Sequence, residues 1–178
     1  MMLKGKPIPG VVDAVDELNR RGFPYRVVSN FSLQARDTLA GYGQRVGLTI
    51  PVERLATALS TTAEWTRRTY PAGPLFVMTS QDGRREFEGQ RLLTDEEADA
   101  PDAQAVAVVI GDSSDRLTYE NMNRAFRLIR GGAVLVGMHR NPWWLTQAGP
   151  TLDSGAFVAG LEFATSSRAL ILGKPSQR

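Results

Sequence analysis

Two short segments of the sequence carry side chains able to bind a phosphate group. VVSN ends at Asn30, and GKPS, near the end of the chain, contains Lys174. Each follows an apolar run typical of a buried strand. A hydroxyl, an amide and an ammonium meeting at one edge of a single parallel sheet would form an anion cradle. We therefore predict phosphate binding by Ser29, Asn30 and Lys174. Strand-end, turn and surface-lysine roles remain open for them.

The loop HRNPWW follows another apolar run and begins at His139. Its imidazole, guanidinium, amide and two indole groups could cover a bound anion or ring, since aromatic faces stack on rings and pack against cations. We predict a substrate-binding loop made of His139, Arg140, Asn141, Trp143 and Trp144. A core or partner contact made by the two tryptophans is the open alternative.

The segment GDSSD carries two carboxylates, Asp112 and Asp115, three residues apart after an apolar run. Such a pair can hold magnesium. Asp and Ser are also common turn and capping residues, and Asp115 lies just ahead of an expected helix. We favour the capping role and assign no metal ligand in this chain.

The composition excludes several classes of site. The chain has 178 residues, of which 42% are apolar and 22% charged, as in an ordinary globular protein. A net charge of +2 and scattered arginines, including the pairs Arg67-Arg68 and Arg84-Arg85, argue against a nucleic-acid partner. The lack of cysteine and the single histidine exclude disulfides, thiolate sites and multi-histidine zinc sites. No apolar run is long enough for a membrane span, and we expect a cytoplasmic protein.

Helical and strand patterns alternate along the chain, which predicts an α/β fold with a parallel sheet. Ser32 is expected to cap the helix that follows the first strand, and Ser154 to cap the last helix. The expected helices cover residues 11–20, 32–43, 58–70, 84–89, 117–130 and 154–165. The expected strands cover residues 25–29, 75–79, 105–111, 133–138 and 169–172.

Six segments, taken in order, make the chain resemble the haloacid dehalogenase (HAD) superfamily of phosphatases. They are KPIPG, VVSN, LTYENMNRAFRLIRGGA, HRNPWW, DSGAFVAGLEFAT and LILGKPS. The resemblance is to subfamily IIA, which has an inserted α/β cap and includes pyridoxal-phosphatase-like and phospholysine/phosphohistidine-phosphatase-like members. GKPS and the LTYE helix are its most specific segments.

The resemblance implies a phosphomonoester phosphatase that acts on a small phosphorylated metabolite through an aspartyl-phosphate, with Mg²⁺ as cofactor. It assigns Ser29 to the hydroxyl that binds the transferring phosphoryl group and Asn30 to the same loop. It assigns Lys174 to the position that orients the nucleophile, so Ser29 and Lys174 are the expected catalytic residues. Caps in this family often carry a dimer contact, and we expect a homodimer through the cap.

The resemblance also implies a Rossmann-like parallel-sheet core with an inserted cap. The expected division is a first part of the core at residues 1–50, an α/β cap at residues 51–151 and a return to the core at residues 152–178. The boundaries are placed in Pro-bearing or polar loops near Pro51 and Thr151.

Two segments of the family pattern are missing from the sequence. The DxDG nucleophile segment should stand just before LKGKPIPG, where only Met1 and Met2 are found, and an acidic metal-binding segment should follow GKPS. We therefore expect an incomplete core, an inactive fragment, and magnesium ligands only in the complete protein. We expect the cap half to be better ordered. A non-catalytic binding or dimerisation module is the alternative, and a nucleotide binder is disfavoured because no GxGxxG loop follows a strand.

Overall fold

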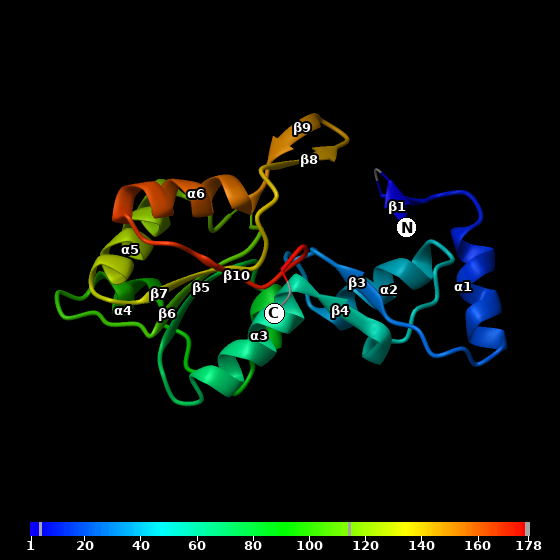
Figure 1. Ribbon diagram of the computed structural model, residues 1–178, viewed down its shortest axis with the longest axis horizontal. Helices are drawn as coiled ribbons and strands as arrows, with labels where there is room; N and C mark the ends of the chain where they lie inside the picture. The colour runs from blue at the N-terminus through cyan, green and yellow to red at the C-terminus, as the bar shows by residue number, and fades with distance from the viewer. Residues whose placement is uncertain (4, 114, 177–178) are drawn as a thin grey trace.

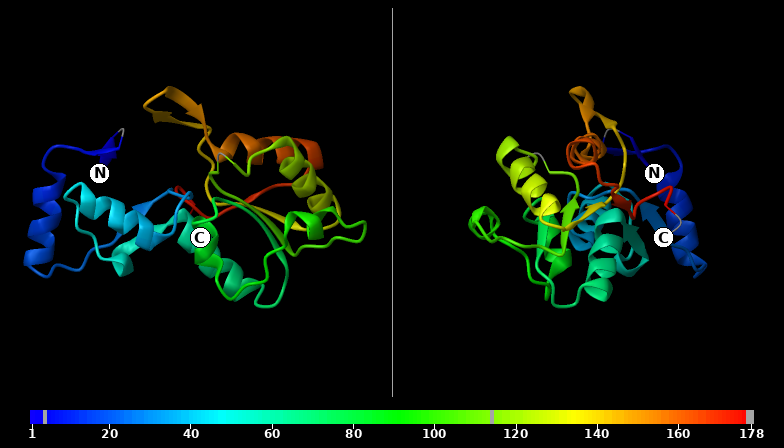
Figure 2. Two further views of the ribbon diagram at one scale, coloured as in Figure 1. Left: turned by 180° about the vertical axis from the view of Figure 1, so that it is seen from behind. Right: turned by 60° about the vertical axis from the view of Figure 1, so that its left-hand side comes forward.

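The computed structural model describes residues 1–178 apart from residues 4, 114 and 177–178. The helices and strands form two lobes joined at a narrow waist (Figure 1). We call residues 1–57 the first lobe and residues 58–172 the second lobe. Residues 173–176 return to the waist, near β3 (Figures 1 and 2).

The first lobe has a thin core. Its elements are β1 (Met2–Leu3), β2 (Lys6–Pro7), α1 (Val11–Arg20), β3 (Val27–Ser29), α2 (Arg36–Arg45), the 3-10 helix η1 (Val52–Arg54) and β4 (Leu55–Thr57). β1 and β2 form an antiparallel pair, and β3 and β4 form a parallel pair in which Ser29 is aligned with Thr57. The buried apolar side chains cluster at Val15, Leu48, Ile50 and Leu55. No residue of α2 is buried.

The second lobe is a helix–sheet–helix sandwich. Its helices are α3 (Ala58–Thr69), η2 (Gly83–Phe87), α4 (Asp95–Asp99), α5 (Tyr119–Arg130) and α6 (Ser154–Thr165). Its strands are β5 (Leu75–Met78), β6 (Ala107–Ile110), β7 (Val134–Gly137), β8 (Trp143–Thr146), β9 (Gly149–Leu152) and β10 (Leu170–Ile171). Four strands form a parallel sheet in the order β10-β7-β6-β5.

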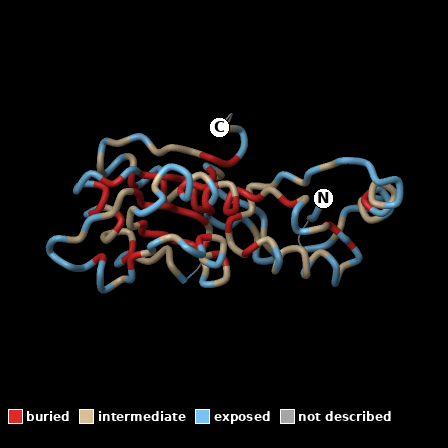
Figure 3. Tube along the Cα trace, turned by 90° about the horizontal axis from the view of Figure 1, so that it is seen from below, coloured by how far each residue is buried: buried red, intermediate tan, exposed pale blue. Residues whose placement is uncertain are grey.

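Strand alternation explains the two layers of helices. Successive side chains of a strand point to opposite faces, and every residue of β5 and β6 is buried. Phe76 and Met78 pack with α5 and α6, whereas Leu75 and Val77 pack with α3. The sheet is therefore covered on both faces, as the unbroken apolar run of β6 predicted. Figure 3 shows the buried residues gathered in this lobe.

The sequence predicted an α/β fold with a parallel sheet, and this is confirmed, but three capping assignments were wrong. The N-cap of α2 is Ala35, because the Ser32 hydroxyl is engaged elsewhere. The helix after GDSSD is capped by Thr118, while Asp115 accepts a hydrogen bond from Ser113. The cap of α6 is Asp153, and Ser154 is the first helical residue.

The sequence analysis also missed five strands. The HRNPWW loop runs into the antiparallel hairpin β8–β9, which projects from the second lobe (Figure 1). β4 was missed because it has only three residues and runs directly into α3. The β1–β2 pair was not expected either.

The strands that precede the two phosphate-binding segments lie in different sheets. β3 pairs with β4, whereas β10 pairs with β7 in the four-stranded sheet. The prediction of one sheet carrying both segments was therefore wrong for the described residues. Because β4 belongs with β3, and β10 with β7, we propose domain boundaries near Thr57 and Gly173 in place of Pro51 and Thr151. No helix in the described part of the chain is long and apolar enough to cross a bilayer.

Candidate functional site

A pair of hydrogen bonds joins the two segments predicted to bind phosphate. Asn30 Nδ2 donates to the carbonyl of Lys174 at 2.9 Å, and Asn30 Oδ1 accepts from the amide of Lys174 at 2.7 Å. One side-chain amide thus binds both backbone groups of Lys174, as a neighbouring strand would. Segments 144 residues apart in sequence are therefore held side by side at the waist.

The Lys174 side chain ends at β3. Its Nζ donates to the carbonyl of Val28 at 3.1 Å, one residue before Ser29. The ammonium and the Ser29 backbone therefore lie at the same end of β3. An ammonium has three donors, so the others remain available for the oxygens of an anion.

Gly173 allows this close approach. A Cβ added at Gly173 would lie 2.4 Å from the carbonyl oxygen of Met138 and 2.9 Å from Asn30 Oδ1. The Gly173 amide also donates to that Met138 carbonyl at 2.7 Å. A larger residue would push Lys174 away from Asn30. The sequence pattern assigns Gly173 no role beyond its place in GKPS.

Ser29 ends β3 and begins the loop toward α2. Its Oγ accepts the amide hydrogen of Phe31 at 3.2 Å. The hydroxyl keeps its own hydrogen for a further acceptor, because a hydroxyl both donates and accepts. Ser29 is therefore flanked by Val28, whose carbonyl accepts from Lys174, and by Asn30, whose side chain binds the Lys174 backbone. The Asn30 amide already donates to Lys174 and Asn141. Anion binding by the Ser29 hydroxyl and the Lys174 ammonium stays a prediction.

Asn141 is the member of the HRNPWW loop that reaches this cluster. Its Oδ1 accepts a long hydrogen bond of 3.4 Å from Asn30 Nδ2. Its backbone carbonyl accepts from the amide of Gly155, at the start of α6. Asn141 therefore connects the phosphate-binding candidates with the second lobe.

His139 is buried beneath this loop, with a relative exposure of 2%. Its Nε2 lies 3.0 Å from Ser32 Oγ and 3.3 Å from Ser154 Oγ, and its Nδ1 accepts the amide hydrogen of Asn141 at 3.4 Å. The Asn141 contact places the ring proton on Nε2. In the structure the imidazole links Ser32 of the first lobe with Ser154 of the second. Substrate contact by His139 stays a prediction.

Ser32, in the first lobe, has hydrogen-bonded contacts with three residues of the second lobe. Besides His139, its Oγ accepts the amide hydrogen of Asp112 at 2.9 Å, and its carbonyl accepts from Thr79 Oγ1 at 2.7 Å. Sequence reasoning missed this role, because a serine shortly before a helix is typical of a cap. No local pattern predicts its distant partners.

Burial changes the ionisation of two groups near the waist. Burial lowers the pKa of His139 below its usual value, and the nearby Asp153 carboxylate partly offsets this. Burial also raises the pKa of Asp112, and the charge of Asp153 raises it further. Both shifts favour the neutral forms of these side chains.

The other predicted substrate contacts lie away from the cluster. The Arg140 guanidinium forms an ion pair with Glu162 of α6, with one contact at 2.9 Å. Trp143 and Trp144 lie on β8 and are 57% and 43% exposed. The structure therefore brings Asn141 to the phosphate-binding candidates, but not Arg140 or the tryptophans.

The side chains do not form a magnesium site in the part of the chain that the structure describes. There, no three carboxylate or imidazole groups converge to hold a metal ion. The described residues therefore do not fit the Mg²⁺ implied by the resemblance.

The chain is similar to known proteins in sequence and in structure. Rat phospholysine phosphohistidine inorganic pyrophosphate phosphatase is 30% identical over 178 residues, covering 97% of this chain and 60% of that protein. Bovine haloacid dehalogenase-like hydrolase domain-containing protein 2 is 27% identical over 176 residues, covering 96% and 61%. The chain thus spans about 60% of the length of these relatives.

Solved structures show the same fold. A hypothetical protein of Pyrococcus horikoshii superposes with a TM-score of 0.87 at 24% identity, covering 97% of this chain and 67% of that one. The p-nitrophenyl phosphatase of Archaeoglobus fulgidus gives a TM-score of 0.84 at 23% identity, covering 97% and 64%. The family model for haloacid dehalogenase-like hydrolases matches residues 1–92, just over half of the chain. The chain therefore belongs to the haloacid dehalogenase-like hydrolase family, as its sequence segments predicted.

Proposed function

We propose that the chain forms the phosphate-binding part of a phosphomonoester phosphatase for small phosphorylated metabolites. The observation that carries the proposal is the Asn30–Lys174 pair of hydrogen bonds, which joins the two phosphate-binding segments. In this proposal Ser29 donates to a phosphoryl oxygen, and Lys174 offsets the negative charge that gathers there. The relatives named as phosphatases support this activity over a non-catalytic module.

The chemistry that these residues contribute is electrostatic. A phosphate monoester carries up to two negative charges, and hydrogen bonds to a charged group are stronger than neutral ones. Lys174 is held in place by its backbone, so little reorganisation is needed when an anion binds. The aspartyl-phosphate step and the magnesium dependence implied by the resemblance stay predictions, and Asn141 remains the best-placed candidate for a further substrate contact.

Orthophosphate binding by this chain, measured by isothermal titration calorimetry, tests the proposal. We expect Lys174→Gln to weaken binding about tenfold or more, since it removes a charge-assisted hydrogen bond. Ser29→Ala should weaken it less. Lys6→Gln is the matched control, because Lys6 is an exposed lysine of β2. Equal loss in Lys6→Gln and Lys174→Gln, or no loss in either, would contradict the proposal.

A turnover assay complements the binding measurement. We expect p-nitrophenyl phosphate to be hydrolysed by the complete protein with magnesium, and Lys174→Gln to reduce the rate strongly. This chain alone is expected to be inactive. Hydrolysis by the chain alone that survives Lys174→Gln would place the chemistry elsewhere.

We also propose a homodimer formed through the β8–β9 hairpin. The support is four exposed apolar side chains of the hairpin, Trp143, Trp144, Leu145 and Leu152, which are 57%, 43%, 42% and 67% exposed. Strand alternation places Trp143, Leu145 and Leu152 on one face of the hairpin and Trp144 on the other. Light scattering should give a dimer mass that falls in a Trp143→Ala, Trp144→Ala variant. Phe163→Ala is the control, because Phe163 is 90% exposed but lies on α6. A monomer mass for the unmodified chain would exclude this dimer.

A further inference from the structure

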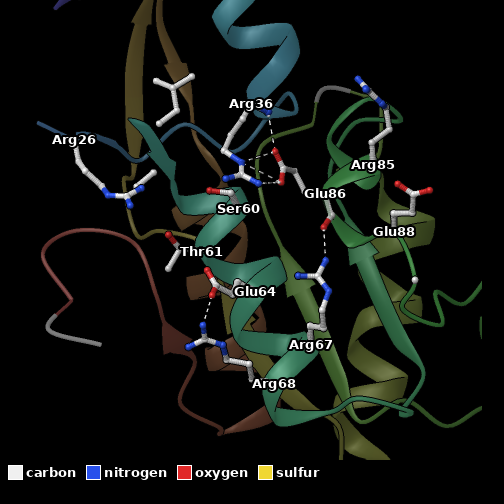
Figure 4. Close-up of a pocket in the computed structure, with 13 residues that line it drawn as sticks. Arg26, Arg36, Ser60, Thr61, Glu64, Arg67, Arg68, Arg85, Glu86 and Glu88 are labelled. Carbon is white, nitrogen blue, oxygen red and sulfur yellow. Dashed lines mark hydrogen bonds and ion pairs between the residues drawn. The ribbon is translucent and has the colours of Figure 1, made fainter. Parts of the chain in front are cut away.

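A second polar recess lies on the outer side of the waist. It is an open groove of about 670 Å³ between β4 and the start of β3 in the first lobe, and α3 and η2 in the second (Figure 4). We call it the arginine groove, because five arginines line it: Arg26, Arg36, Arg67, Arg68 and Arg85. Its volume is typical of a site for a small ligand.

Folding brings together arginines that are scattered in the sequence. Arg26 precedes β3, Arg36 begins α2, and Arg67 and Arg68 lie in the last turn of α3. The pairs Arg67-Arg68 and Arg84-Arg85 belong to different elements, yet one member or both of each pair face the same groove. A simple solvated helix face would not require this convergence.

Three of the five guanidinium groups already have carboxylate partners. Arg36 forms a two-pronged ion pair with Glu86 across the lobes, with its closest contact at 3.1 Å. Arg68 pairs with Glu64 on α3, and Arg85 pairs with Asp37. These pairs shape the groove but contribute little unbalanced charge to it.

Arg26 and Arg67 have no carboxylate partner among the described residues. Arg26 donates to the backbone carbonyl of Glu53 at 2.7 Å, and Arg67 donates to that of Glu86 at 3.0 Å. Each guanidinium has five N–H donors, so most of them remain unused. The backbone contacts fix the two groups in place while leaving their positive charge uncompensated.

Neutral donors and a lack of aromatic groups define the kind of ligand. The Thr61 side chain lies between Arg26 and Glu64 (Figure 4) and has no hydrogen-bond partner among the residues that the structure covers. Glu88, the carboxylate of the groove that has no cationic partner within the described ranges, lies on the opposite side from Arg26 (Figure 4). No aromatic side chain lines the groove, so it offers no surface on which a base could stack.

We propose that the arginine groove binds a small polyanion, a molecule with two or more phosphate groups, through Arg26 and Arg67. Guanidinium groups bind phosphate oxygens in pairs, and two of them separated along a groove favour a ligand with more than one phosphate. Arg26 belongs to the first lobe and Arg67 to the second, so the bound ligand links the lobes. The groove is distinct from the cluster of Ser29, Asn30 and Lys174.

Binding of inorganic tripolyphosphate tests this proposal. The measurement is made by calorimetry in a Lys174→Gln background, because the ligand could otherwise occupy the Lys174 cluster. We expect binding to persist in that background and to weaken about tenfold in each of Arg26→Gln and Arg67→Gln, the usual effect of losing a charge-assisted hydrogen bond. Arg130→Gln is the matched control, because Arg130 is an exposed arginine at the end of α5, outside the groove. No binding in the background, or equal binding by all variants, overturns the proposal.

Four further measurements define the ligand: three by calorimetry in the Lys174→Gln background, and one by NMR on the unmodified chain. Orthophosphate should bind the groove at least tenfold more weakly than tripolyphosphate, and ATP no more tightly. Tighter binding of ATP or of a short single-stranded DNA would overturn the polyphosphate class. In the unmodified chain, tripolyphosphate should shift the NMR signals of residues 26 and 60–68. Shifts confined to Ser29 and Lys174 would overturn the site.

Discussion

The two lobes use the same alternation of strand and helix but differ in how much of it they bury. β6 is central in a four-stranded sheet, and all four of its residues are buried. β3 pairs only with β4 among the described strands, and Val28 at its centre is 55% exposed. The comparison shows that the local sequence pattern determines whether a segment forms a helix or a strand. The packing of other elements on its faces determines how stable that helix or strand is.

The largest expected effect concerns amide hydrogen exchange. Core strands open only with global unfolding, whereas weakly covered elements open locally. Amides of residues 105–138 should therefore exchange on the order of a thousandfold more slowly than those of residues 1–45. Exchange measured by mass spectrometry on the intact chain checks this. Similar protection in the two segments would remove the contrast between the lobes.

A matched pair of valine substitutions should show the next largest effect. Val109→Ala in β6 removes methyl groups from a side chain of 0% exposure and should lower the free energy of unfolding by about 2–3 kcal/mol. Val28→Ala in β3 should change it by less than about 0.5 kcal/mol, because that side chain is largely solvated. Urea unfolding followed by circular dichroism gives both values. Equal losses would mean that β3 is covered in solution.

These contrasts show how far the sequence could predict the fold. β6 was predicted because it lies in an unbroken apolar run that ends at Gly111, and α5 because its helical pattern ends at Gly131 and Gly132. In both elements the apolar residues of the pattern are the ones expected to be buried. β8–β9 was missed because its strands are exposed and interrupted by Pro150, so no apolar alternation marks them. β4 was missed because three residues are too few to show the two-residue alternation of a strand.

The residues of the candidate site could be predicted from the sequence, but the contacts that bring them together could not. Ser29, Asn30 and Lys174 were recognisable because each follows an apolar run. Their meeting depends on Asn30 binding the Lys174 backbone, a long-range contact without a local signal. The same reason explains why Ser32 was taken for a cap and why His139 was expected to face a ligand.

The smallest expected effect is a pH dependence at the waist. His139 is the single histidine, and burial lowers its pKa in the folded state from the usual 6.5. The unfolded chain then takes up the proton first, so stability is complete above about pH 6.5 and falls as the pH drops toward the folded-state pKa. Urea unfolding between pH 7.5 and 5.5, values on either side of that usual pKa, should show the loss.

The control for this effect uses both a variant and a direct titration. His139→Gln should flatten the slope in the same pH range, because no imidazole remains in the chain. NMR titration of the unmodified protein should give an imidazole pKa below 6.5, the usual value, because burial lowers it more than the Asp153 charge raises it. A value above the usual one would mean that the Asp153 charge outweighs burial.

Thr57 gives the molecule a direct mechanical connection between its halves. It is the last residue of β4 and also the N-cap of α3, where it exchanges hydrogen bonds with Ser60 in a capping box. It is also aligned with Ser29 across the β3–β4 pair. No residue separates strand from helix, and Thr57 is paired across one strand with Ser29. A reorientation of α3 would therefore displace Thr57 and, through the β3–β4 pair, the residue proposed to hold phosphate.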